Sequence, residues 1–231
     1  MTVAACILAA SPDAALRQVD GTPNVRRLVD LAWAGGAFPV IVVAPDPRGT
    51  VAAALAGTTA VLGAPTAGEA GPAGQLAMAF DLARTRVAGT DAALLWPAHM
   101  GWLDAETVTS LIEAHGTDRE TVLRPAFRGV AGWPILVPLE HLPGLRSLPP
   151  DLEPEAIADT LAARVPTRTV ELGDPGIVLG LDTPREELPV FEGPPEPPAG
   201  QRHEWGALVA SGPDEAGGDE PPGTPHAGDL A

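Results

Sequence analysis

The chain has 231 residues, enough for one sizeable α/β domain with appendages, and its apolar content of 45% is sufficient to fill a core. The formal net charge is −16 and all 14 basic residues are arginine, so the basic surface that nucleic-acid binding needs is not expected. Because lysine is absent, Schiff-base chemistry and a phosphate-binding lysine are excluded.

The first predicted element is a strand over residues 3–10, a continuous apolar run of the kind that parallel sheets bury on both faces. It contains Cys6, the sole cysteine, which excludes an intrachain disulfide and a Cys-based zinc site and which we interpret as a small buried hydrophobe. The run has no positive leading segment and is too short to span a bilayer. We therefore expect a soluble cytoplasmic protein without a membrane segment.

Strands and helices are predicted to alternate along the next part of the chain. A polar loop over residues 11–23 precedes a helix over residues 25–32, with Asn24 as its N-cap and Gly35-Gly36 as its stop. The further strands are predicted at residues 39–44, 59–62, 92–96, 121–124, 135–137 and 167–172. A short alanine-rich helix is predicted after the strand at residues 39–44 and ends at Gly57, and further helices are predicted at residues 76–83, 104–114 and 155–164.

The last structured element is predicted at Thr183-Pro-Arg-Glu186, where Thr183 would be an N-cap and Glu186 would close a capping box. The whole alternation predicts a three-layer α/β domain with a mostly parallel sheet over residues 1–189. Residues 190–231 are dominated by Pro, Gly, Glu and Asp, a composition that predicts a disordered acidic tail. Within it, Trp205-Gly-Ala-Leu-Val-Ala210 is the one patch that could dock on a protein partner.

A candidate ligand site follows the predicted strand at residues 92–96. This strand ends at Pro97, a short loop carries His99, and Asp104 caps the next helix. In open α/β sheets, ligands bind in the crevice beyond the carboxyl ends of the strands. The sequence therefore places His99 at the edge of any reactive centre that the chain has.

Four segments resemble, in order and spacing, the MobA-like nucleotidyltransferases of molybdenum-cofactor maturation. They are Ile7-Leu-Ala-Ala10, Asp20-Gly-Thr-Pro23, Arg124-Pro-Ala-Phe-Arg-Gly129 with Gly132-Trp-Pro134, and Asp174-Pro-Gly-Ile-Val-Leu-Gly-Leu-Asp-Thr-Pro184. The resemblance implies a Rossmann-like nucleotidyltransferase fold. It also implies an enzyme that joins a nucleoside monophosphate from GTP or CTP to molybdopterin and releases pyrophosphate.

The resemblance further implies where a site would be. The first loop of the family binds the triphosphate, which points to Ala10, Ser11 and Arg17. The two acidic positions that hold magnesium in the family correspond to His99 and Asp182, so these are candidate ligands for Mg²⁺ or Mn²⁺ and, with Arg17, candidate catalytic residues. Further candidates for contacts with the nucleotide or a pterin are Gly71, Gly74, Gly132 and Trp133, with Trp102 as another ring that could stack on a flat ligand.

The chain departs from the family at the positions that matter most for transfer. Ser11 replaces a glycine, the first loop looks shortened, and Arg17 is its only cation. His99 stands in place of a metal-binding aspartate, and imidazole suits manganese or zinc better than magnesium. Trp133 replaces a residue that is usually histidine. Since losing one electrostatic donor can cost about 10²–10³ in rate, we expect that several losses leave little ordinary catalysis.

Each candidate also has an explanation without chemistry. His99 would then be an ordinary loop histidine, Arg17 a solvated surface residue, and Asp182 a residue favoured near a helix N-terminus. Glycine-rich turns such as the one around Gly71 and Gly74 are common in proteins of many functions.

Two hypotheses for function follow. The first is a catalytically degenerate family member that binds a nucleotide or pterin nucleotide, or acts as a scaffold or regulator. The second is an active nucleotidyltransferase in which His99 and Asp182 hold a divalent metal. In a third possibility, the tail recruits a protein partner while the domain merely folds. Fold alone does not decide between them.

Overall fold

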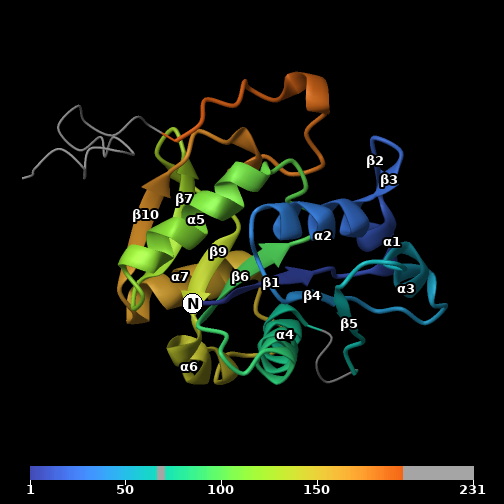
Figure 1. The fold of residues 1–231 in the computed structure, drawn as a ribbon, viewed down its shortest axis with the longest axis horizontal. Coiled ribbons are helices and arrows are strands. Elements are labelled where there is room, and N and C mark those ends of the chain that lie inside the picture. The colour runs from blue at the N-terminus through green and yellow to red at the C-terminus, as the bar shows by residue number, and fades with distance from the viewer. Residues whose placement is uncertain (67–70, 195–231) are drawn as a thin grey trace, which may run out of the picture. The chain divides into compact units, whose positions relative to one another are not determined.

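The computed structural model describes residues 1–66 and 71–194 (Figure 1). Its strands are β1 (Val3–Leu8), β2 (Gln18–Val19), β3 (Thr22–Pro23), β4 (Val40–Val43), β5 (Val61–Gly63), β6 (Ala92–Pro97), β7 (Val122–Phe127), β8 (Val130–Ala131), β9 (Ile135–Pro138) and β10 (Thr167–Glu171). Its α-helices are α1 (Pro12–Leu16), α2 (Asn24–Ala34), α3 (Thr50–Ala54), α4 (Pro72–Arg86), α5 (Ala105–Thr117), α6 (Leu142–Arg146) and α7 (Pro154–Arg164). Short 3₁₀ turns lie at Leu139–His141, Pro175–Ile177 and Arg185–Glu187.

The main sheet has the strand order β10-β7-β9-β6-β1-β4-β5, with β8 paired to β7. The pairs β5–β4, β4–β1, β1–β6 and β7–β10 are parallel, whereas β9 runs antiparallel to both β6 and β7. Every residue of β1, β4, β6 and β9 is buried, as strands covered on both faces should be. The prediction of a mostly parallel sheet is confirmed.

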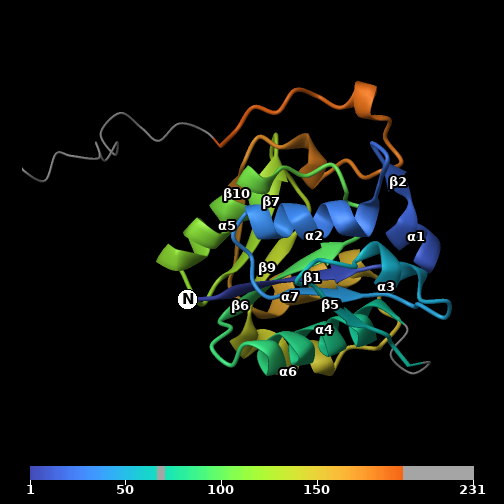
Figure 2. The ribbon, with the colours of Figure 1, turned by 45° about the vertical axis from the view of Figure 1, so that its right-hand side comes forward.

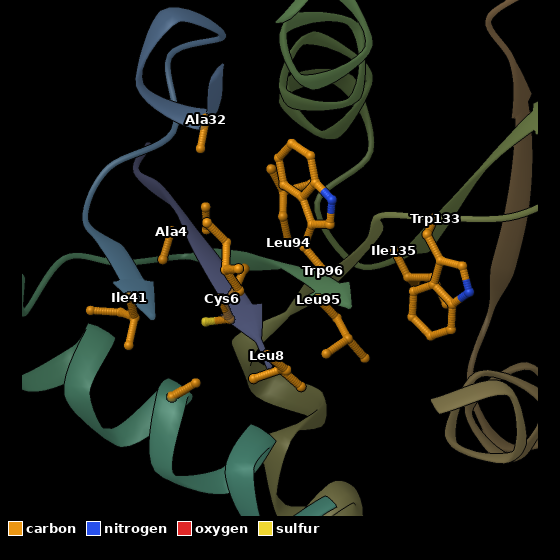
Figure 3. Close-up of a cluster of buried hydrophobic side chains, with 14 of the residues drawn as sticks. Ala4, Cys6, Leu8, Ala32, Ile41, Leu94, Leu95, Trp96, Trp133 and Ile135 are labelled. Carbon is orange, nitrogen blue, oxygen red and sulfur yellow. The ribbon is translucent and has the colours of Figure 1, made fainter. Parts of the chain in front are cut away.

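Helices cover both faces of this sheet. Figure 2 shows α2 and α5 on one face, and α4 and α6 on the other. Side chains alternate between these layers along each strand. Figure 3 shows Leu94 and Trp96 of β6 on one side and Leu95 on the other. Trp96 is fully buried, and its indole Nε1 donates a 2.8 Å hydrogen bond to the carbonyl of Met100. The predicted three-layer architecture is therefore confirmed.

The first predicted loop contains more structure than expected. It holds the short helix α1 and the β2–β3 hairpin. The expectation that Asn24 caps α2 is wrong, because Pro23 occupies the N-cap position and Asn24 is the first helical residue. The side chain of Asn24 is buried and donates a 2.6 Å hydrogen bond from Nδ2 to the carbonyl of Ala98. This asparagine therefore joins α2 to the loop after β6.

The helix predicted from the capping box at Thr183 is also wrong. The structure has only one 3₁₀ turn there, at Arg185–Glu187, with Pro184 before it and no side-chain cap. The carbonyl of Thr183 accepts a 2.9 Å hydrogen bond from the indole of Trp102. Pro189 follows two residues after the turn, and the residue before a proline disfavours helical geometry.

Some predictions concern residues that the structure does not describe. The acidic tail from residue 195 onward, including the patch from Trp205 to Ala210, lies outside the described residues. Within the described residues, no helix combines the length and the apolar character required to cross a bilayer.

Candidate functional site

The carboxyl ends of the central strands β1 and β6 lie side by side. Their last residues, Leu8 and Pro97, are register partners, and the amide of Ala98 donates a 2.8 Å hydrogen bond to the carbonyl of Leu8. The loops that follow these strands therefore start at the same point of the sheet edge. This is the position at which open α/β sheets bind ligands.

A cavity of about 290 Å³ opens at this point. It is lined by Leu8, Ala10, Ala14, Pro72, Gln75, Pro97, Ala98, His99, Glu153, Pro154 and Glu155. Most of this lining is apolar, and Gln75 is a buried polar side chain within it. We call this space the first cavity.

A second cavity, of about 470 Å³, is also lined by His99. It is lined by His99, Met100, Arg124, Val130, Ala131, Gly132, Trp133, Glu155, Asp159, Ile177, Val178, Gly180 and Asp182. His99 and Glu155 line both cavities, so the two spaces adjoin. The structure thus brings together residues that the sequence placed far apart, including His99, Trp133 and Asp182.

The loop that carries His99 is fixed from several sides. Asn24 binds the carbonyl before His99, and Trp96 binds the carbonyl after it. The carbonyl of His99 itself accepts a 2.8 Å hydrogen bond from the amide of Leu181. His99 is nevertheless exposed, so its backbone is held while the residue faces the cavities.

Gly180 packs closely on the loop that carries His99. A Cβ atom there would lie 3.0 Å from the carbonyl oxygen of His99, so a side chain would press on the His99 loop. Close packing of this segment on His99 therefore accounts for the glycine.

Arg17 and Asp182 bind each other. The Nη1 atom of Arg17 lies 2.8 Å from Oδ1 of Asp182, and its Nη2 atom donates to the carbonyl of Leu181. The hydrogen bond and the charge of Arg17 hold the pKa of Asp182 below its usual value, and the charge of His99 acts in the same direction. Both side chains are exposed. The only cation of the first loop is thus directed at a carboxylate.

Two amides of the first loop are hydrogen-bonded within α1. The hydroxyl of Ser11 accepts a 3.1 Å hydrogen bond from the amide of Ala14, and the Ser11 carbonyl accepts one from Ala15. Ser11 is therefore a helix N-cap. Ala10 is exposed beside it and lines the first cavity.

The amides at the start of α4 have protein partners as well. Those of Ala73 and Gly74 donate to the carbonyl of Pro150, at 3.1 Å and 3.3 Å. A Cβ atom at Gly71 would lie 2.2 Å from the same oxygen. Glycine at position 71 is thus required by the close approach of residue 150, and the phosphate contact predicted for Gly71 and Gly74 stays a prediction.

Gly132 and Trp133 form one wall of the second cavity. A Cβ atom at Gly132 would lie 2.0 Å from the carbonyl oxygen of Ile177, to which the Trp133 amide donates a 2.9 Å hydrogen bond. Trp133 is only 6% exposed, and in Figure 3 it lies beside Ile135. Little of its ring is therefore open to a ligand.

Two acidic residues of the second cavity, Glu155 and Asp159, were not predicted from the sequence as site residues. Both come from α7, whose existence the pattern predicted but whose packing against the cavity it did not. Asp159 lies 3.6 Å from Nη1 of Arg124, and the Nε atom of Arg124 is buried without a hydrogen-bond partner among the described residues. With Asp182, the lining carries more carboxylates than cations.

The described residues offer an incomplete ligand set for a resident metal ion. His99 and Asp182 line the same cavity, but no group of three His, Cys, Asp or Glu residues in the described chain is arranged to hold a metal. Magnesium prefers oxygen ligands, and the carboxylate of Asp182 is already bound to Arg17. These residues therefore do not fit a resident magnesium site.

Comparison with protein families gives one match. The family described as "MobA-like NTP transferase domain" matches residues 10–165. No curated protein matches the sequence.

Many solved structures are similar in fold. The protein Rv0371c of Mycobacterium tuberculosis, in complex with manganese, is 20% identical, with 79% of this chain and 95% of that chain covered and a TM-score of 0.58. A nucleotidyl transferase from Methanothermobacter is 18% identical, with 78% and 92% covered and a TM-score of 0.60. A cytidylyltransferase from Leptospira borgpetersenii is 14% identical, with 74% and 76% covered and a TM-score of 0.56. At these identities the likeness shows the fold.

Proposed function

The chain belongs to the MobA-like NTP transferase domain family, and on this premise we propose that it binds a nucleotide or pterin nucleotide in the adjoining cavities without ordinary transferase activity. The observation that carries the proposal is the ion pair between Arg17 and Asp182. One is the only cation of the first loop, and the other occupies an acidic position of the family's metal site. In this protein the guanidinium of Arg17 and the carboxylate of Asp182 bind each other, and neither is left free to bind a phosphate or a metal with its full charge.

The donors that already have protein partners support a loss of transfer. Phosphoryl-type chemistry depends on amide donors, cations and a metal that neutralise the developing charge. The amides of Ala14 and Ala15 are hydrogen-bonded within α1, and those of Ala73 and Gly74 are bound to Pro150. Each missing donor can cost about 10²–10³ in rate.

The shape of the site supports retained binding. The first cavity is small and mostly apolar with a few polar groups, which is the usual character of a small-ligand site. The second cavity adjoins it at His99 and has room for a second ligand or the remainder of a larger one. A divalent metal would have to be brought by the phosphates of the nucleotide, since magnesium in nucleotide sites commonly binds one or two carboxylates plus phosphates.

Calorimetric titration tests the proposal. The purified protein is titrated with GTP, CTP and ATP, first with magnesium and then with manganese, and pyrophosphate release is measured with molybdopterin as acceptor. We expect micromolar binding of at least one nucleotide and no release at ordinary rates of about 1–10³ s⁻¹. Absence of binding would exclude the nucleotide site, and fast release would exclude degeneracy.

An active nucleotidyltransferase is the second candidate, favoured by the presence of His99 and Asp182 in one cavity. Imidazole suits manganese better than magnesium, so activity would depend on manganese. Under this hypothesis, His99→Ala and Asp182→Ala each abolish pyrophosphate release. Unchanged release in both variants would rule out a metal-binding role for the pair.

A further inference from the structure

Two ion pairs join residues 17–20 to residues 182–185. In the first pair the earlier residue is the arginine, and in the second it is the aspartate. Arg17 binds Asp182, and three residues further along each stretch Asp20 binds Arg185. The first stretch runs from α1 into the β2–β3 hairpin, and the second leaves the second cavity at Asp182. We call residues 181–185 the clasp.

The clasp has further polar contacts with the loop after β6. The amide of Leu181 donates to the carbonyl of His99 at 2.8 Å, and the indole of Trp102 donates to the carbonyl of Thr183 at 2.9 Å. The guanidinium of Arg185 lies 6.0 Å from the centre of the Trp102 ring, with Arg27 at 5.9 Å. The clasp therefore touches both loops that border the cavities.

Little apolar burial holds the clasp in place. Leu181 is 5% exposed, but Asp182, Pro184 and Arg185 are exposed, and the segment has no regular structure before the 3₁₀ turn. An exposed ion pair shifts an equilibrium by only about one- to fivefold. A ligand that competes for one of these pairs can therefore open the clasp.

We propose that the clasp occupies Arg17 beside the second cavity, and that nucleotide phosphate opens the clasp by competing with Asp182 for Arg17. Both terminal nitrogens of Arg17 are occupied, one by the Asp182 carboxylate and the other by the Leu181 carbonyl. Phosphate oxygens match the same guanidinium fork. A phosphate that binds Arg17 thus displaces both clasp residues together. This inference rests on the proposed nucleotide binding.

The pair between Asp20 and Arg185 affects the same equilibrium, between the closed clasp and the open clasp, but it lies outside the cavities. Neither residue lines either cavity. If the pair favours the closed state, then removing it lowers the cost of opening, and by linkage it raises nucleotide affinity by the same factor. The effect is opposite to that expected when a binding residue is lost.

The variant Asp20→Asn tests the inference. Asp20 has a φ of 51°, a region that asparagine tolerates, so the exchange removes the charge without straining the turn. Arg185→Gln removes the other partner, and the double variant completes the cycle. Asp30→Asn is the matched charge control, because Asp30 forms an exposed pair with Arg26 within α2.

Two measurements are made on the full chain. Titration with GTP and with inorganic triphosphate, each with magnesium, is expected to give about two- to fivefold tighter binding in Asp20→Asn and Arg185→Gln. The double variant should bind these ligands no more tightly than either single variant, and Asp30→Asn should have the same affinity as the unmodified protein. Hydrogen exchange at Leu181 and Thr183 should be faster in the clasp variants and on addition of GTP, with β1 unchanged.

Three outcomes overturn the inference. Unchanged exchange at Leu181 in Asp20→Asn would show that the pair does not hold the clasp. Equal or weaker affinity with faster exchange would show that the clasp does not oppose the nucleotide. If neither the unmodified protein nor the variants bind GTP or triphosphate, the proposed function falls as well, and the exchange data then show whether the clasp exists without that ligand.

Discussion

The buried carboxylate of Asp174 accepts a 2.6 Å hydrogen bond from the hydroxyl of Thr107. The same side chain accepts bonds from the amides of Asp104 at 3.0 Å and Gly176 at 2.8 Å. Burial raises the pKa of Asp174, although these hydrogen bonds oppose the shift. One carboxylate therefore fastens the start of α5 to the segment that continues along the second cavity to Asp182.

Asp174→Ala is expected to destabilise the protein by about 3 kcal/mol, because it leaves several donors at this buried position without a partner. Asp174→Asn should fall between this variant and the unmodified protein, since its amide oxygen can satisfy only part of the set. Urea unfolding curves give the free energies. Equal stability of all three proteins would show that the network contributes nothing.

The central elements could be predicted from the sequence because their burial pattern is local. The apolar runs that became β1 and β6 are buried on both faces, and Asp104 caps α5 through its carboxylate, as predicted. Helix α1 was not predicted, because five residues are too few to show helical periodicity. The capping box at Thr183 failed because the Trp102 hydrogen bond and the Asp20–Arg185 pair hold this segment away from helical geometry.

The sequence predicted the position of the candidate site but not all of the residues that line it. The rule that ligands bind beyond the carboxyl ends of strands pointed to His99, and the structure places Asp182 in the same cavity. Glu155 and Asp159 were missed because nothing in α7 shows which of its faces borders a cavity. The partner of Arg17 was equally hidden, since it lies 165 positions away in the chain. Long-range pairing depends on tertiary packing, which local patterns do not record.

His115 is expected to make the fold sensitive to acid. The residue is fully buried, and neither ring nitrogen has a hydrogen-bond partner among the described residues. Burial lowers its pKa, outweighing the opposing charge of Asp91. The unfolded chain thus binds a proton more readily than the folded protein, so stability falls as the pH drops below the ordinary value of about 6.5.

Substitution isolates the contribution of His115. His115→Leu should remove part of the loss of stability between pH 7.5 and pH 5, measured as the shift in the urea midpoint. His115→Gln keeps a buried polar group that does not titrate, so it should be less stable than the unmodified protein at pH 7.5 but should lose less stability on going to pH 5, as His115→Leu does. A pH dependence identical in all three proteins would assign the acid sensitivity to other groups.

Gly132→Ala is expected to distort the wall of the second cavity. The added Cβ would lie 2.0 Å from the carbonyl oxygen of Ile177, a backbone atom that cannot rotate away. Overpacking of this kind costs about 1–3 kcal/mol, which should appear as a lower melting temperature together with weaker nucleotide binding. Gly89→Ala is the matched control, because its Cβ would meet no atom within 4 Å. Equal effects of the two changes would contradict the packing argument.

Arg17→Gln is expected to raise the pKa of Asp182 towards the ordinary aspartate value of about 3.9. In the unmodified protein, the lowered pKa means that the pair favours the folded state above that value, and that this contribution is lost as the pH falls through the lowered pKa. The ¹³C shift of the Asp182 carboxyl carbon, followed from pH 7 to pH 2, reports the titration directly. GTP should raise the same pKa in the unmodified protein if phosphate takes Arg17 from Asp182. An Asp182 titration that neither Arg17→Gln nor GTP changes would mean that the ion pair is not formed in solution.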